Sequence, residues 1–137
     1  FEKFVKAKEK ADLNMYPHED IKIAMVYKKM GLDKQAAHYF KSYADYCEID
    51  QSIYKSASMA VKYAYEGSYD ETINQLKIFA SQDNYQYWIL IFMKLDPIMK
   101  PLKNDMEFEK VMQKIEKKFW ENQKKLRKSL EEQGLIN

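Results

Sequence analysis

Apolar and small residues recur along this chain at helical spacing, and one such pattern occurs twice. Residues 24–40 read AMVYKKMGLDKQAAHYF, and residues 60–76, which start 36 positions later, read AVKYAYEGSYDETINQL. In each copy an Ala is followed by Tyr three positions on and by Gly seven positions on. Positions three or four apart share one helical face, and Gly readily adopts the left-handed conformation found at helix ends. The pattern predicts two helices that end at Gly31 and Gly67.

A second helix is expected after each glycine, with the same 36-residue repeat. Ala36 and Phe40 in the first copy correspond to Thr72 and Leu76 in the second, and the members of each pair are four positions apart. Such a pair lies on one helical face, which we expect to return and pack on the first helix. The pattern therefore predicts an antiparallel helical hairpin with a tight turn, repeated once.

Polar residues next to the glycines supply start signals for the second helices. Ser68 and Glu71 have the spacing of a capping box, in which the side chain of each residue accepts a hydrogen bond from the backbone N–H of the other residue. Asp33 stands in the matching place after Gly31 and is expected to cap the first copy less completely.

The pattern changes after the second copy. Asp83 and Gln86 can cap a short helix over residues 84–95, NYQYWILIFMKL, which is apolar nearly all round. Such a helix is expected to be buried on several sides. Pro97 and Pro101 follow, and each disfavours helix at the residue before it, so this stretch is predicted to be an extended linker.

A long final helix is predicted over residues 106–133, capped by Asn104 or Asp105. At 1.5 Å per residue it would be roughly 42 Å long. Its first half carries a regular apolar stripe that should pack on the hairpins: Phe108, Val111, Met112, Ile115 and Phe119. Beyond Trp120 the stripe thins among many lysines, so the outer half is expected either to project or to meet another chain.

Composition supports an all-α fold. Gly and Pro are scarce, at three each in 137 residues, so turns are few and elements long. Apolar residues make up 46% and charged residues 32%, which suits amphipathic helices, and an aromatic share of 15% argues against disorder. A net charge of +2 gives no global attraction to nucleic acid. No apolar run approaches the roughly 20 residues of a membrane-spanning helix.

The repeated pattern resembles the tetratricopeptide repeat, whose period is near 34 residues. The resemblance covers about residues 18–80 and implies an all-α fold of antiparallel helical-hairpin repeats, an α-α superhelix closed by a long C-terminal capping helix. It implies one domain over residues 1–137. Within it, residues 1–16 would be the remnant of a preceding repeat, 17–50 the first repeat, 51–82 the second, and 83–137 divergent closing helices.

The closing segment resembles the end of repeat regions in bacterial signalling and regulatory proteins. There an Asp-Pro, a Pro-Leu and an Asn-Asp-x-x-Phe precede the final helix, and this chain has them in that order: Asp96, Pro97, Pro101, Leu102, Asn104, Asp105 and Phe108. The resemblance implies a regulatory module. Because the chain begins at Phe1, we expect it to be a fragment of a longer protein.

The side chains that carry chemistry are scattered, so we expect neither an enzyme nor a metal or cofactor site. His18 lies in the first turn of a helix that starts at Pro17, and His38 lies on the outer side of its helix. Two separated histidines do not supply the three or four converging ligands of a metal site. Cys47, the single cysteine, is expected to be a small buried residue.

The first helices of stacked hairpins line one concave surface, and this is the candidate site. The predicted partner-binding groove consists of Ile21, Met25, Lys28, Lys29, Tyr54, Ala57, Val61 and Tyr65. In tetratricopeptide repeats this face binds peptides, and here it would be an apolar, aromatic trough with lysines at its edge. Either a partner or the chain's own final helix fills it.

The expected partner is a protein or peptide, or another domain of the same chain, and a cytoplasmic location is slightly favoured. Two alternatives remain open. The lysines of the final helix, among them Lys124, Lys125 and Lys128, could serve a regulator as an accessory nucleic-acid-binding surface. The outer half of the same helix could also form a homodimer.

Overall fold

The computed structural model describes residues 1–11, 17–83, 86 and 88–136. Their secondary structure is helical, and no strand occurs in this part of the chain, which confirms the all-α prediction. Contacts between residues divide the chain into two compact units, Phe1–Gln51 and Ser52–Asn137. This boundary lies within one residue of the predicted boundary between the two repeats.

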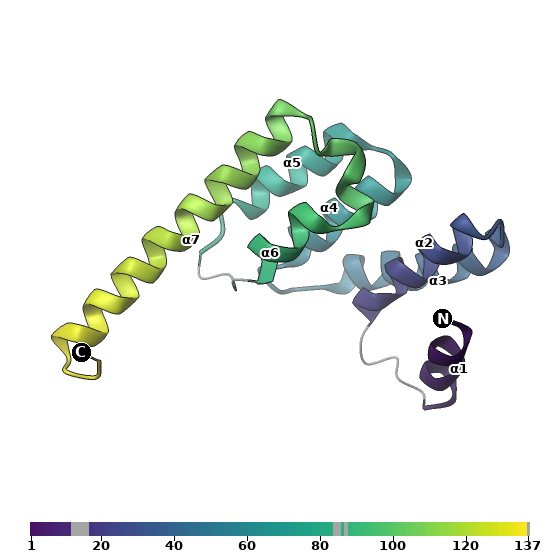
Figure 1. Cartoon of the computed structure of the whole chain (residues 1–137), viewed down its shortest axis with the longest axis horizontal. Coiled ribbons are helices and arrows are strands. Elements are labelled where there is room, and N and C mark those ends of the chain that lie inside the picture. Colours follow the sequence, from purple (N-terminus) through teal and green to yellow (C-terminus); the bar gives the residue numbers. More distant parts are fainter. Residues whose placement is uncertain (12–16, 84–85, 87, 137) are drawn as a thin grey trace. The chain divides into compact units, whose positions relative to one another are not determined.

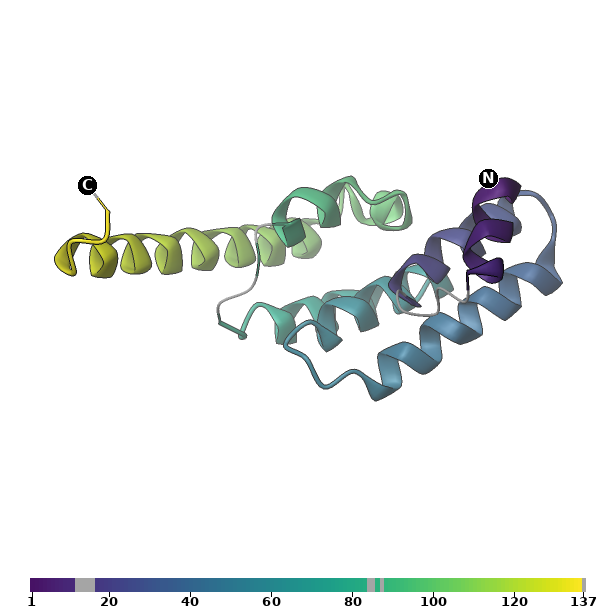
Figure 2. The ribbon, with the colours of Figure 1, turned by 90° about the horizontal axis from the view of Figure 1, so that it is seen from below.

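Unit 1 contains α1 (Glu2–Lys10), the 3-10 turn η1 (Pro17–Glu19), α2 (Asp20–Lys29) and α3 (Asp33–Ile49). Figure 1 and Figure 2 show α2 and α3 lying side by side as a hairpin. At the turn between them Gly31 has φ +72°, as predicted. The Leu32 N–H donates to the Tyr27 carbonyl across the turn at 3.0 Å, which closes the end of α2.

Unit 2 contains α4 (Lys55–Glu66), α5 (Tyr69–Phe79), α6 (Trp88–Leu95), the 3-10 helix η2 (Pro97–Leu102) and α7 (Met106–Glu132). The turn between α4 and α5 repeats that of unit 1. Gly67 has φ +83°, and the Ser68 N–H donates to the Tyr63 carbonyl at 2.9 Å. Each participant lies 36 positions after its counterpart, so the sequence repeat is a repeat of the hairpin turn.

The packing faces of both hairpins follow the predicted spacing closely. Ala24 and Ala60 have no exposed surface, and the same holds for Thr72 and Leu76 in the second copy. Phe40 is only half-buried, as are Tyr27 and Tyr63. The buried face of α3 instead consists of Ala36, Tyr39, Tyr43 and Cys47.

The predicted capping box is wrong. Ser68 is the N-cap of α5, but its side chain makes no capping hydrogen bond. Asp33 is the first residue of α3, and the cap position belongs to Leu32. In both copies the backbone N–H of the residue after the glycine, Leu32 or Ser68, donates to the preceding helix instead. In the second copy the Ser68 carbonyl also accepts a hydrogen bond from the Thr72 hydroxyl at 2.9 Å.

The long final helix is confirmed as α7. Asp105 caps it, and its carboxylate accepts from the N–H groups of Glu107 at 2.8 Å and Phe108 at 2.9 Å. All five residues of the predicted stripe are buried, and α7 contacts α5 and α6. Lys118 fastens its middle by donating to the Ser81 carbonyl at 2.8 Å.

The predicted extended linker after α6 is wrong, because residues 97–102 form the 3-10 helix η2. The Asp96 carboxylate accepts from the Ile98 N–H at 2.9 Å, and Pro97 stands at the first helical position. A proline is well suited there, since its fixed φ is already helical and its missing N–H would have no partner. Burial of Ile98, Met99 and Leu102 then holds the segment to the unit.

Candidate protein-interaction surface

Helix α6 is apolar nearly all round, yet it is not buried on several sides as its sequence predicts. Ile89 and Met93 face the interior of the unit. Four large side chains remain exposed, at 43% for Trp88, 39% for Ile91, 59% for Phe92 and 73% for Leu95. Their spacing of three, four and seven positions places them along one helical face. We call these four residues the α6 stripe.

Contacts on the other sides of α6 fix its orientation. The helix contacts η2 and α7 (Figure 1), and Lys94 pairs with Glu109 of α7 at 3.3 Å. That lysine, followed by the amide of Gln113, holds the pKa of the Glu109 carboxyl below its usual value.

The start of α6 is tied to Tyr54, the residue just before α4. The Gln86 N–H donates to the Tyr54 hydroxyl at 2.8 Å, and the Trp88 indole N–H donates to the Gln86 side chain at 2.8 Å. The rings of Tyr54 and Trp88 lie 5.5 Å apart. The predicted start of this helix at residue 84 lies outside the described residues, and the structure begins it at Trp88. Asp83, which was expected to cap it, pairs with Lys118 at 3.1 Å.

The predicted groove residues fall into two sets, one in each unit. In unit 1, Ile21 is fully buried and therefore belongs to the core, and Met25 is half-buried. Lys28 and Lys29 are exposed at the end of α2, where positive charge is favourable to the helix dipole.

In unit 2, three of the four groove residues lie on α4, and Tyr54 is the residue just before that helix. Ala57 is buried in the core, whereas Tyr54, Val61 and Tyr65 are half-buried. Tyr54 packs against Phe79, with ring centroids 6.1 Å apart, in addition to its contact with Trp88. Since η2 also contacts α4, the closing segments already occupy part of this helix's surface.

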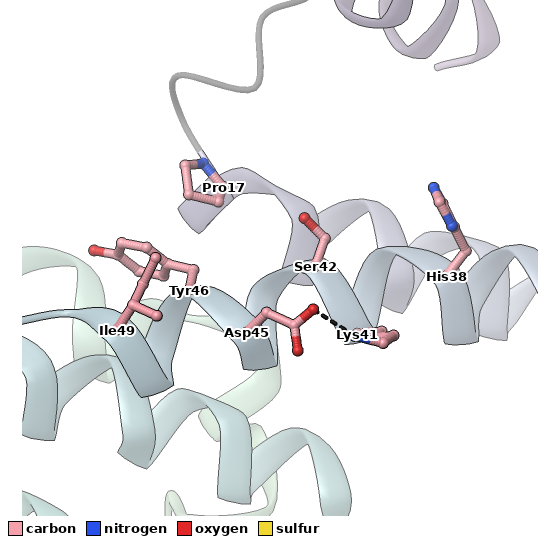
Figure 3. Close-up of a pocket in the computed structure, with 7 residues that line it drawn as sticks. All are labelled: Pro17, His38, Lys41, Ser42, Asp45, Tyr46 and Ile49. Carbon is pink, nitrogen blue, oxygen red and sulfur yellow. Dashed lines mark hydrogen bonds and ion pairs between the residues drawn. The ribbon is translucent and has the colours of Figure 1, made fainter.

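A shallow hollow of about 390 Å³ lies on unit 1 and was not predicted (Figure 3). Six of its lining residues come from α3 and one from η1: His38, Lys41, Ser42, Asp45, Tyr46, Ile49 and Pro17. Lys41 and Asp45 pair with each other along the helix, and the Ser42 hydroxyl donates to Asp20 at 2.6 Å. These three polar side chains therefore bond within the protein.

A buried polar cluster joins α1 to the hairpin of unit 1, and sequence reasoning missed it. Lys8 of α1 forms an ion pair with Asp20 of α2, and both side chains are buried. The Tyr39 hydroxyl donates to Glu9 at 2.6 Å. Burial first, and then the bond to the Glu9 carboxylate, raises the pKa of Tyr39 well above its usual value. Helical periodicity carries no signal for such a pairing, because the partners come from separate helices.

Three basic residues of α7 pair with acids four positions further along the same helix. Lys117 pairs with Glu121 at 3.9 Å, and Arg127 pairs with Glu131 at 2.8 Å. Lys128 lies 3.7 Å from Glu132. Such pairs at four-residue spacing are typical of a solvated helix face.

Comparison with protein-family models, curated proteins and solved structures finds no match for this chain. In the described part of the chain no cluster of His, Cys, Asp and Glu could hold a metal ion. Nor does any helix there have the length and apolar character needed to cross a membrane.

Proposed function

We propose that this chain is a non-catalytic protein-interaction module and that the α6 stripe is its principal contact surface. The observation that supports the proposal is the exposure of four large apolar side chains along one face of a short helix. Contiguous exposed apolar patches of this kind usually mark interaction sites. Trp88 and Phe92 are aromatic, and aromatic residues are enriched in interface cores.

The surroundings of the stripe favour binding over a purely structural role. α6 is anchored through Ile89, Met93, the Lys94–Glu109 ion pair and the ring contact of Trp88 with Tyr54. The remaining three residues of the stripe, Ile91, Phe92 and Leu95, are exposed beyond these anchors. The remaining groove residues Met25, Val61 and Tyr65 would extend the binding surface of each unit. The resemblance to closing elements of bacterial regulatory repeat regions supports a role as the regulatory part of a larger protein.

The proposal is tested by placing charge on the stripe. In a Phe92→Glu, Leu95→Glu double variant both side chains replaced are exposed, so the midpoint of chemical denaturation should stay near that of the wild type. A partner captured from the native host, identified and purified, should bind the variant at least tenfold more weakly in calorimetric titration. Ile78→Glu is the matched control, because Ile78 is a similarly exposed apolar residue on α5.

A different result would identify a structural role. If the double variant lost about 2 kcal/mol or more of stability, as core truncations do, the stripe would be covered within the chain and the proposal would be wrong. Unchanged affinity of the partner for a stable variant would equally reject the α6 stripe as the contact.

A further inference from the structure

We infer that the partner of the α6 stripe is a second copy of this chain, paired through two antiparallel α6 helices about a twofold axis. The inference rests on the proposed function, because it names the partner of the same surface. Its first basis is chemical: the helix WILIFMKL has one charged residue, Lys94, and that residue is paired with Glu109. Two copies can therefore meet on this face without opposing like charges.

The polar hydrogen-bonding groups of the α6 side chains are already satisfied within unit 2. The Trp88 indole N–H donates to Gln86, and Lys94 lies 3.3 Å from Glu109, so covering the stripe leaves neither without a partner. Recognition of a foreign protein generally uses polar groups to discriminate among candidates, and the stripe offers none. Homodimer interfaces are more apolar than other protein interfaces, which favours a like partner.

Twofold symmetry also fits the order of residues along the stripe. In an antiparallel pair the axis falls between Ile91 and Phe92, and each Trp88 lies opposite the Leu95 of the other copy. Large side chains then meet smaller ones at both ends, which allows them to interdigitate. Closed twofold pairs are by far the commonest form of homo-oligomer.

The size of the stripe predicts how tight the pair is. The four exposed fractions together amount to about two fully exposed large side chains, and at roughly 200 Å² each they leave on the order of 400 Å² of apolar surface on each copy. Two copies would bury about 800 Å² through the stripes, less than the roughly 1,200 Å² of the smallest stable interfaces. The dimer should therefore be reversible and should form in the micromolar range or above.

Sedimentation equilibrium of the purified chain, from low micromolar to millimolar concentration, tests the pairing. We expect a monomer–dimer equilibrium that Phe92→Glu with Leu95→Glu weakens at least tenfold. Ile78→Glu on α5 and Leu126→Glu on α7 should leave it unchanged, although both positions are exposed and apolar. Loss of the dimer in Leu126→Glu alone would assign the contact to α7 and overturn the inference.

Disulfide cross-linking tests the geometry. The chain's single cysteine, Cys47, is buried, so an introduced thiol reports only on its own site. Phe92→Cys should cross-link with itself under mild oxidation, whereas Leu95→Cys should cross-link efficiently only when mixed with Trp88→Cys. Efficient self-linking of Leu95→Cys with none of Phe92→Cys would contradict the antiparallel pair.

Two failures can be told apart. A chain that remains monomeric at all concentrations, with charged-stripe variants as stable as the wild type, overturns the second copy as partner and leaves the proposed function standing. Charged-stripe variants that unfold at markedly lower denaturant show that the stripe is covered within the chain, and both proposals then fall.

Discussion

The α2/α3 hairpin and the α4/α5 hairpin have the same backbone turn, but different chemistry joins them to their neighbours. The turns match in the sign of φ at Gly31 and Gly67 and in the hydrogen bond that crosses each one. The first hairpin holds α1 through a buried ion pair, Lys8–Asp20, and through a tyrosine bonded to a carboxylate. The second contacts α7 through α5, next to the buried apolar stripe of that helix.

This difference shows that a repeated local pattern fixes the hairpin and leaves the means of attachment open. A buried ion pair is costly to break from one side, because the remaining charge stays buried without its partner. Truncation of a buried apolar side chain lowers the stability of the protein by an amount that grows with the volume removed. The two units should therefore respond differently to substitution, and the largest effect is expected at the buried ion pair of unit 1.

Asp20→Ala should be the most damaging of these changes. It removes the carboxylate that both Lys8 and the Ser42 hydroxyl contact, and breaking a buried pair from one side costs about 3–5 kcal/mol. Hydrogen exchange should show the loss in unit 1 and little change in unit 2. The matched control replaces both partners, Lys8→Met with Asp20→Leu, and should recover most of the stability. A loss below about 1 kcal/mol for Asp20→Ala would show that the ion pair does not hold α1.

Leu76→Ala should be the corresponding change in unit 2. Leu76 is fully buried in α5, and truncation of such a residue costs about 3 kcal/mol. Chemical denaturation measures the loss, and hydrogen exchange should locate it in unit 2. Ile78→Ala, two positions on and exposed, should cost less than about 0.5 kcal/mol. Equal losses for the two variants would mean that α5 is oriented differently.

Gly31→Val and Gly67→Val should destabilise to the same extent, because the turns are the same. No atom lies within 4 Å of a Cβ added at either position, so the cost comes from the left-handed backbone alone. We expect about 1–2 kcal/mol for each, and less for Asn, which tolerates this conformation. Denaturation midpoints that differ strongly between the two Val variants would break the equivalence of the turns.

Tyr39→Phe should remove an alkaline sensitivity of unit 1. Its hydroxyl bond to Glu9 contributes about 1 kcal/mol, and its pKa is raised on folding above the value of about 10 expected for an unfolded chain. The stabilisation is therefore present below pH ~10 and is lost as the pH rises further. Wild-type stability should fall above that pH more steeply than that of the variant. If the stability of the wild type and that of the variant fall in parallel above pH ~10, the loss of stability at alkaline pH comes from other groups.

Replacement of Lys124, Lys125 and Lys128 together by Gln should have the smallest effect, within about 0.5 kcal/mol. All three are exposed on the outer half of α7. The same variant tests the nucleic-acid alternative, since binding through these lysines would weaken steeply with salt and disappear in the variant. If the wild type binds no nucleic acid, or binds it without dependence on salt, the nucleic-acid alternative is rejected in favour of the protein-interaction proposal.

Several features of the fold could be read from the sequence because they depend on near neighbours. The glycines that end α2 and α4, the small residues Ala24 and Ala60, and the apolar stripe of α7 all follow from helical geometry and from the conformational freedom of Gly. Errors arose where two local signals competed. Pro97 alone predicts extended chain, but with Asp96 as a cap it begins η2.

The candidate surface was less predictable. The apolar sequence of α6 predicts that the helix is buried, but it does not indicate which face of the helix another element covers. Ile21 and Ala57 were expected in a groove and lie in the cores of their units. Tyr54 was expected to line that groove, and its hydroxyl accepts from the backbone of Gln86. A residue's helical face is set by its position in the helix, whereas its exposure depends on what packs there.

The sequence by itself determined an all-α chain, two copies of one hairpin turn and a long capped final helix, because each depends on interactions within a few residues. Only the tertiary structure decided that Lys8 meets Asp20 and that Trp88, Ile91, Phe92 and Leu95 stay exposed. Both outcomes depend on which surfaces distant helices present to one another. That choice follows from the packing of the whole unit, and no spacing along the chain encodes it.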